Sequence, residues 1–194
     1  VSLTIDGTHA VSAKEIRAVL ATQPGGRWPW SRKSTFDQAA FEDDLERIRR
    51  LYQDRGYADA RIDHVDVAFN DARDAVKVAV TINEGEPLRI ASGSFVGFEA
   101  VAPEVLAGLD RSSVDAGKVR DRGTVAALRQ RILDLLRDHG YAYAKVNATE
   151  KDVGQNRMAL TFTATPGPPA TFGAITVVGA HTLEDRIIRR QLIV

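Results

Sequence analysis

A repeated segment constrains this chain more than any single motif in it. Residues 56–62, Gly-Tyr-Ala-Asp-Ala-Arg-Ile, recur as residues 140–146, Gly-Tyr-Ala-Tyr-Ala-Lys-Val, at an offset of 84 residues. Each copy follows a charged helical pattern and precedes an alternating strand pattern that ends in a Gly/Pro turn, at residues 84–87 and 165–169. Several features repeated at nearly one offset indicate an array of small modules rather than one domain built around a single site.

The first copy predicts a β-α-α-β-β module. Residues 1–5 alternate as a strand, and apolar residues at 11, 16, 19 and 20 recur at helical spacing. A second helix is expected to begin after Asp37, a good N-cap residue, and to end at Gly56, where a left-handed residue is favoured. Two strands follow, at 60–69 and 76–82, and a change of phase near Asp63 and His64 predicts a β-bulge.

The second copy repeats this order. We expect a strand over 88–96, a helix over 101–109, a second helix from about 125 to Gly140, and strands over 142–149 and 158–164. The predicted boundaries are 1–86 and 87–168 for two modules and 169–194 for the start of a third, truncated one. Because a three-stranded sheet cannot leave an apolar face bare in water, the two helices of each module should cover that face, which gives an α+β fold.

Composition and motifs argue against several functions. The 26 basic and 26 acidic residues leave no net charge, so no global basic field would attract nucleic acid, and KH-like RNA-binding modules would need a GXXG loop that is missing. The absence of Cys excludes disulfides and thiolate metal sites, and no apolar run approaches the roughly 20 residues of a membrane-spanning helix.

Catalytic readings also lack support in the sequence. The four His residues lie one to a segment, without metal-ligand spacing, and residues 93–97 form neither a phosphate-binding loop nor a dinucleotide fingerprint. Ser112 and Ser113 have no nucleophile elbow around them. We therefore expect no enzyme activity, no cofactor and no metal.

The ordered set of motifs resembles a POTRA domain. The residues that carry the resemblance are the helix-terminal stretch 54–57, the strand and turn 80–87, and the Phe-Gly-Ala-Ile-Thr-Val-Val-Gly stretch 172–179. Tandem modules of this kind are similar to the periplasmic part of BamA/TamA-type outer-membrane assembly factors. The chain departs from the pattern at 165–169, which lacks the acidic residues of 84–87, and at its first strand, which lacks the Phe-Gly start.

The resemblance implies a periplasmic, non-enzymatic role as part of an outer-membrane protein. Such modules receive unfolded outer-membrane or secreted clients, pass them to a C-terminal β-barrel, and dock accessory lipoproteins or periplasmic proteins. Two alternatives stay open: a structural spacer, and the POTRA region of a two-partner secretion transporter. A division-complex protein is a further relative, but it normally has one module, and the repeat argues against it.

Strand addition is the physical hypothesis for client binding, because the edge of an open sheet carries unpaired N–H and C=O groups. POTRA sheets place the middle strand of the sequence at an edge, with a groove beside it to which Leu45 and Tyr52 would contribute. The alternative is that both residues are plain core and that the charges of Arg61, Asp63 and Lys145 blunt the edges. The candidate client-binding residues are Ala60, Arg61, Ile62, Val65, Val67, Phe69, Ala144, Lys145 and Val146.

The loop around Pro29 and the Pro-bearing turns between modules are further candidate sites. Trp28 and Trp30, which flank Pro29 among basic residues, form a candidate partner loop; the alternative is that both side chains fold back onto the helices. The turns at 84–87 and 166–169 are expected to join successive modules, and their Pro residues to restrict the angle between them.

Overall fold

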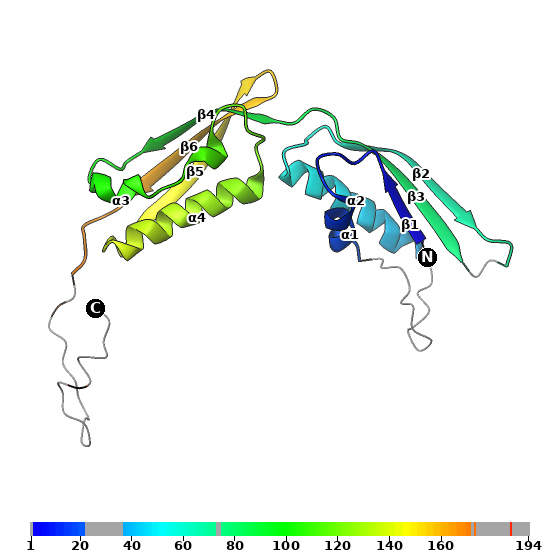
Figure 1. Cartoon of the computed structure of the whole chain (residues 1–194), viewed down its shortest axis with the longest axis horizontal. Helices are drawn as coiled ribbons and strands as arrows, with labels where there is room; N and C mark the ends of the chain where they lie inside the picture. The colour runs from blue at the N-terminus through cyan, green and yellow to red at the C-terminus, as the bar shows by residue number, and fades with distance from the viewer. Residues whose placement is uncertain (1, 22–36, 73–74, 172, 174–186, 188–194) are drawn as a thin grey trace.

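Two three-stranded sheets, each lying over its own helices, make up the chain in a computed structural model (Figure 1). The structure describes residues 2–21, 37–72, 75–171, 173 and 187. The loop with Trp28 and Trp30 and nearly all of the expected third module lie outside these residues. Within them, no helix combines the length and the hydrophobicity that crossing a bilayer requires.

The first module has the order β-α-α-β-β. Its strands form the sheet β1-β3-β2, in which β3 is central, parallel to β1 and antiparallel to β2. The pairing register of β2 shifts between Ile62 and His64, where the change of phase in the sequence predicts a bulge. The elements are β1 (Ser2–Asp6), α1 (Ala13–Val19), α2 (Gln38–Asp54), β2 (Arg61–Phe69) and β3 (Val76–Asn83).

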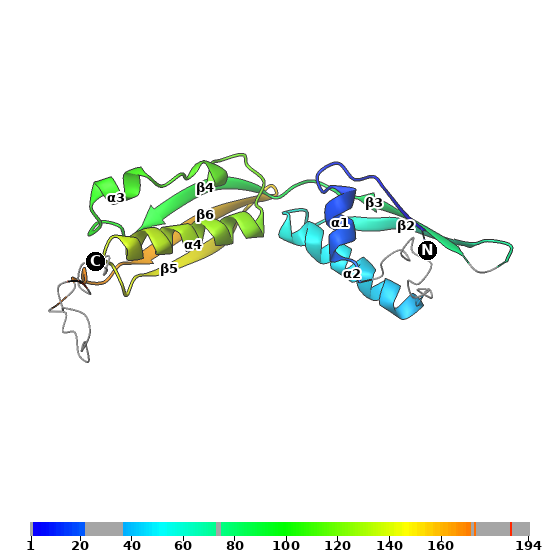
Figure 2. The same ribbon diagram turned by 60° about the horizontal axis from the view of Figure 1, so that its bottom comes forward.

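The second module repeats this topology with the sheet order β4-β6-β5. Strand β6 is central, parallel to β4 and antiparallel to β5. Figure 2 shows the three strands side by side, with α4 running along one face of the sheet. The elements are β4 (Arg89–Val96), α3 (Pro103–Ala107), the 3-10 turn η1 (Ser112–Val114), α4 (Arg122–Asp138), β5 (Lys145–Gly154) and β6 (Arg157–Thr165).

Local chemistry defines both ends of α2. The Asp37 carboxylate accepts the N–H groups of Ala39 and Ala40, two of the donors that the first turn of a helix leaves unpaired. At the other end, Gly56 has φ +89°, which an L side chain rarely adopts, so the chain can leave the helix for the sheet. Gly140 does the same after α4, with φ +90°.

Each module has its own hydrophobic core between the sheet and the helices. In the first, the alternating residues of β3 turn one face toward α2, and Val76, Val78, Val80 and Ile82 are all buried. In the second, Leu160 and Phe162 of β6 pack under α4. The α+β fold of helix-covered three-stranded sheets, expected from the sequence, is confirmed.

Some predicted element boundaries are wrong. The helix expected over 101–109 is confined to Pro103–Ala107, because Pro103 starts it and Gly108 follows its last residue. The strand expected over 142–149 runs instead from Lys145 to Gly154, since residues before it form a turn in which the Ala144 N–H binds the Tyr141 carbonyl.

Candidate partner-binding edges and the joint between the modules

The two sheets have four edge strands, of which β4 is paired at its start by another segment of the chain and the short β1 is bound at one carbonyl. Residues 117–120 run antiparallel to the start of β4, where the Ile90 N–H binds the Lys118 carbonyl and the Arg120 N–H binds the Leu88 carbonyl, both at 2.8 Å. At β1, the Arg17 guanidinium donates to the Leu3 carbonyl at 3.3 Å. Strands β2 and β5 are the two longest edges, and no other described segment pairs with their outer sides, although the Arg129 guanidinium lies 3.5 Å from the Val146 carbonyl of β5.

Edge strand β2 carries apolar side chains toward the helices. Ile62, Val65 and Val67 are half-buried and pack against the first core without being covered. The Phe69 side chain, at the hairpin end, is 57% exposed. On the opposite face, Arg61 forms an ion pair with Asp63 at 2.7 Å.

Edge strand β5 offers different chemistry. Val146 is buried, Ala148 is half-buried, and Lys145 is exposed. The Glu150 carboxylate binds the Arg120 guanidinium at 2.6 Å, and the two side chains are only 25% and 13% exposed. The helix-facing side of β5 is thus occupied by a covered Val, a small Ala and a paired charge.

The structure places seven of the nine candidate edge residues within strands. Ala60 and Ala144 lie one residue before β2 and β5, and their N–H groups bind the carbonyls of Tyr57 and Tyr141. The expectation that Tyr52 lines a groove beside β2 is wrong, because its ring is buried in the first core with 1% exposure. Leu45, its neighbour on the same stripe, is half-buried.

The joint between the modules begins at Gly56. The Leu88 N–H, just past the linker, binds the Gly56 carbonyl at 2.7 Å. Gly56 lies so close to the second module that a Cβ added to it would stand 2.4 Å from the Arg120 carbonyl oxygen. The same linker hydrogen bond recurs after the second module, from the Ala170 N–H to the Gly140 carbonyl, again at 2.7 Å.

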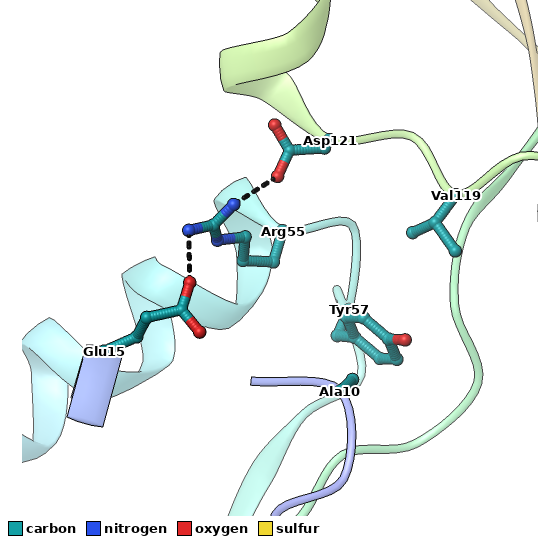
Figure 3. Close-up of a pocket in the computed structure, with 6 residues that line it drawn as sticks. All are labelled: Ala10, Glu15, Arg55, Tyr57, Val119 and Asp121. Carbon is teal, nitrogen blue, oxygen red and sulfur yellow. Dashed lines mark hydrogen bonds and ion pairs between the residues drawn. The ribbon is translucent and has the colours of Figure 1, made fainter. Parts of the chain in front are cut away.

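Charged side chains connect the end of α2 to the start of α4. Arg55 reaches Glu15 of α1 at 2.6 Å with one nitrogen and Asp121, the N-cap of α4, at 3.0 Å with the other (Figure 3). Arg122 pairs in the opposite direction with Asp54 at 3.1 Å. Burial alone would raise the pKa of Asp121, but the Thr124 N–H and Arg55 outweigh it and hold that pKa below its usual range.

Beside Arg55 is an open hollow of about 240 Å³. Figure 3 shows Tyr57 and Ala10 of the first module facing Val119 of the second across it. Arg55 already has both carboxylates as partners, so the hollow offers no unsatisfied charge to a ligand. Nor do the described residues bring three His, Cys, Asp or Glu side chains together in a way that could hold a metal ion.

The tip of the β5–β6 hairpin also holds the linker. Its turn residues Gln155 and Asn156 have φ +54° and +53°, the conformation of a tight two-residue hairpin turn. The Asn156 side-chain amide donates to the carbonyls of Glu86 and Pro87 at 3.1 and 3.2 Å. The linker is therefore tied to both modules.

A single carboxylate anchors the loop that precedes α1. Glu84 accepts the N–H groups of His9 and Ala10 at 3.0 Å and of Val11 at 3.4 Å. It also accepts the Tyr52 hydroxyl. Burial of Glu84 alone would raise the pKa of its carboxyl, but these four donors outweigh burial and lower it.

The sequence pattern predicts Glu84 only as part of a linker and indicates no functional role for Arg55, Asp121 and Asn156. One signal was available: Asp121 precedes a helical pattern and is a good N-cap residue. The backbone partners of Glu84 lie 73 to 75 residues away in sequence and Tyr52 lies 32 residues away, so no local pattern could connect them.

Comparisons with known proteins agree with this architecture. The family model POTRA, described as surface antigen variable number repeat, matches residues 2–85 and 88–167. The outer membrane protein assembly factor BamA of Neisseria meningitidis is 24% identical over 98% of this chain, and a putative outer membrane protein assembly factor of Treponema pallidum is 23% identical over 96%. The chain spans 24% and 22% of the lengths of these two relatives.

Among solved structures, the chain is similar to POTRA3-5 of Haemophilus influenzae BamA. The two are 27% identical, with a TM-score of 0.49, and the match covers 97% of this chain and 74% of that one.

Proposed function

This chain belongs to the POTRA family, and from that premise we propose that it is the periplasmic POTRA region of an outer-membrane β-barrel assembly or translocation protein. In this role it binds unfolded clients or accessory partners and passes them toward a C-terminal barrel. The role is one of binding rather than catalysis. It is supported by the relatives named as outer-membrane assembly factors and by the order of the two modules.

The observation that carries the proposal is the contrast between occupied and unoccupied sheet edges. The β4 edge is hydrogen-bonded by residues 117–120 and the short β1 is contacted by Arg17, whereas no described strand pairs with the outer side of β2 or β5. Backbone hydrogen bonds to such an edge give affinity that does not depend on the partner's sequence. That suits a protein that must accept many β-rich clients.

NMR titration of the ¹⁵N-labelled chain with short extended peptides, taken from the strands of outer-membrane barrels, tests this proposal. Binding by strand addition predicts chemical-shift changes along 61–69 or 145–154, with slowed amide exchange in the same strand. If the fold stays intact and neither edge responds, the strand-addition role is refuted.

The joint supports a second candidate, a structural spacer. Residues 86–88 are hydrogen-bonded both to Gly56 of the first module and to Asn156 of the second, and two ion pairs connect the end of α2 with the start of α4. Such contacts set the distance and angle between two modules whether or not a client is bound. The titration separates the candidates, because a spacer requires no response at either edge.

A further inference from the structure

The two unoccupied edges differ in the surface that they would offer to an added strand. Beside β2, three half-buried aliphatic side chains face the helices: Ile62, Val65 and Val67. The corresponding side of β5 has a buried Val146, a half-buried Ala148 and the Glu150 carboxylate paired with Arg120. On the helix-facing side, an added strand would therefore cover three aliphatic side chains at β2 but only Ala148 at β5. The one other exposed apolar residue of β5, Val153, lies at its hairpin end beside the register shift.

At Val65 and Val67, the backbone N–H and C=O groups of β2 point away from β3, toward an incoming strand. The Asn70 N–H binds the Ala75 carbonyl at 3.1 Å, and the Ala75 N–H binds the Asn70 side-chain oxygen at 3.0 Å, so the backbone of Asn70 faces β3 as in a hydrogen-bonded pair. Hydrogen-bonded and non-hydrogen-bonded pairs alternate along an antiparallel ladder. The pairs Val67–Val78 and Val65–Val80 are consequently of the second kind, so the N–H and C=O of both β2 valines point away from β3.

At β5, the outward side is partly covered. The Arg129 guanidinium of α4 reaches the Val146 carbonyl at 3.5 Å, and Glu150 is held beneath the sheet by Arg120. An incoming strand would have to displace the first contact, and its side chains would meet a paired carboxylate instead of apolar surface. Both features make β5 the poorer acceptor.

The solvent-facing side of β2 carries a carboxylate that would attract a basic residue of an added strand. Asp66 has no ion-pair partner among the described residues, whereas the neighbouring Asp63 is paired with Arg61. Because Val65 and Val67 would exchange hydrogen bonds with an added antiparallel strand, Asp66 between them would sit at a non-hydrogen-bonded position. Facing side chains are closest there, and opposite charges across the pair stabilise it while like charges destabilise it.

From these observations we infer that the β2 edge, and not the β5 edge, is where an extended client segment adds. The segment has aliphatic side chains at alternate positions that cover Val65 and Val67, and a basic residue on its other face opposite Asp66. This inference rests on the proposed function and specifies which module performs it and what chemistry the site selects.

Three nine-residue peptides test the inference on the ¹⁵N-labelled chain. The first alternates Val and Thr with a central Lys on the Thr face, the second has Glu in place of that Lys, and the third has the first composition with its Val residues grouped together. We expect shifts along 61–69 with the first peptide, several-fold weaker binding of the second, and no saturable binding of the third. Asp66→Lys should reverse the order of the first two peptides, and Asp66→Asn should remove the difference between them.

The outcomes separate the inference from the proposed function. Shifts confined to 145–154 would overturn the inference and leave strand addition standing. No response at either edge to any peptide would overturn both. Concentration-dependent broadening of the β2 signals without peptide would identify a second copy of this chain as the occupant, which also contradicts the inference. Because Asp66 is exposed, the thermal midpoint of both variants should stay near that of the unchanged chain.

Discussion

The hydroxyl of Tyr52 donates a hydrogen bond to the Glu84 carboxylate at 3.0 Å, and this pair has no polar counterpart in the second module. At the corresponding places that module has Leu136 and Pro166, both buried. A buried donor and its acceptor have thus been replaced together by apolar residues. Such a joint replacement leaves no polar group unsatisfied, whereas changing one partner alone would.

Removing one partner should therefore be costly in the first module. Glu84→Gln replaces a carboxylate that accepts four donors, and we expect it to lower the free energy of unfolding by about 1–3 kcal/mol, with Tyr52→Phe costing roughly 1 kcal/mol. Urea denaturation of both single variants and of the double variant measures the coupling. The exposed Glu86 of the same turn supplies the control, since Glu86→Gln should change little. A coupling indistinguishable from zero would contradict the pairing.

The first module should lose stability in acid. The donors around Glu84 lower the pKa of its carboxyl, so its contribution is complete above the unfolded-state pKa of about 4.3 and is lost as pH falls through the lower folded-state value. Asp121, the N-cap of α4, acts in the same direction in the second module. Thermal midpoints measured from pH 7 to pH 2 should fall at the acidic end, and less steeply for Glu84→Gln. Equal slopes for the two proteins would remove Glu84 as a source of the acid sensitivity.

Gly56→Ala should destabilise the chain through two separable effects. Its φ of +89° costs an L residue about 1–2 kcal/mol, and the added Cβ would also meet the Arg120 carbonyl. Gly117 has the same φ of +89° with nothing within 4 Å of an added Cβ, so Gly117→Ala isolates the conformational cost. The difference between the two variants in denaturant unfolding reports the close approach of the modules. If Gly56→Ala costs no more than Gly117→Ala, that approach is absent in solution.

Arg55→Met should loosen the joint more than it weakens either module. Exposed ion pairs contribute only about 0–1 kcal/mol, so the unfolding midpoint should move little. Loss of the contacts to Glu15 and Asp121 should widen the range of orientations between modules, which residual dipolar couplings measure in each module separately. Arg49→Met, which removes an exposed ion pair with Glu46 inside α2, is the control. It should leave the alignment tensors of the two modules related as they are in the unchanged chain.

Local signals in the sequence predicted much of the fold. Asp37 caps the start of α2 by binding N–H groups two and three residues away, and Gly56 terminates the helix by its own conformation. The bulge after Ile62 is visible in the sequence as a shift in the alternation of apolar and polar residues. Edge strands β2 and β5 were predicted as edges from the family resemblance, and the sheet orders agree.

The joint could not be predicted in the same way. The partner of Arg55 in α4 lies 66 residues further along the chain, and Glu84 binds a loop at the opposite end of its module. No local pattern in the sequence indicates either contact. The Arg55 contact depends on how the two modules meet, and the Glu84 contact depends on the fold placing the end of β3 beside the loop before α1. The sequence leaves Tyr52 open between groove and core for a related reason: a phenol can enter a core when a distant carboxylate accepts the hydrogen bond of its hydroxyl.

The linker hydrogen bond from the Leu88 N–H to the Gly56 carbonyl is repeated from the Ala170 N–H to the Gly140 carbonyl. The chain therefore leaves both modules through the same backbone contact. In both modules the linker is bound at the end of the long helix, by the carbonyl oxygen of a glycine with a positive φ, Gly56 or Gly140. Repeating one such step is a screw operation, so a row of modules built this way would curve with a pitch that each joint sets locally. A change of a few degrees in the backbone angles of one joint would then displace every later module, by a distance that grows with its separation from that joint.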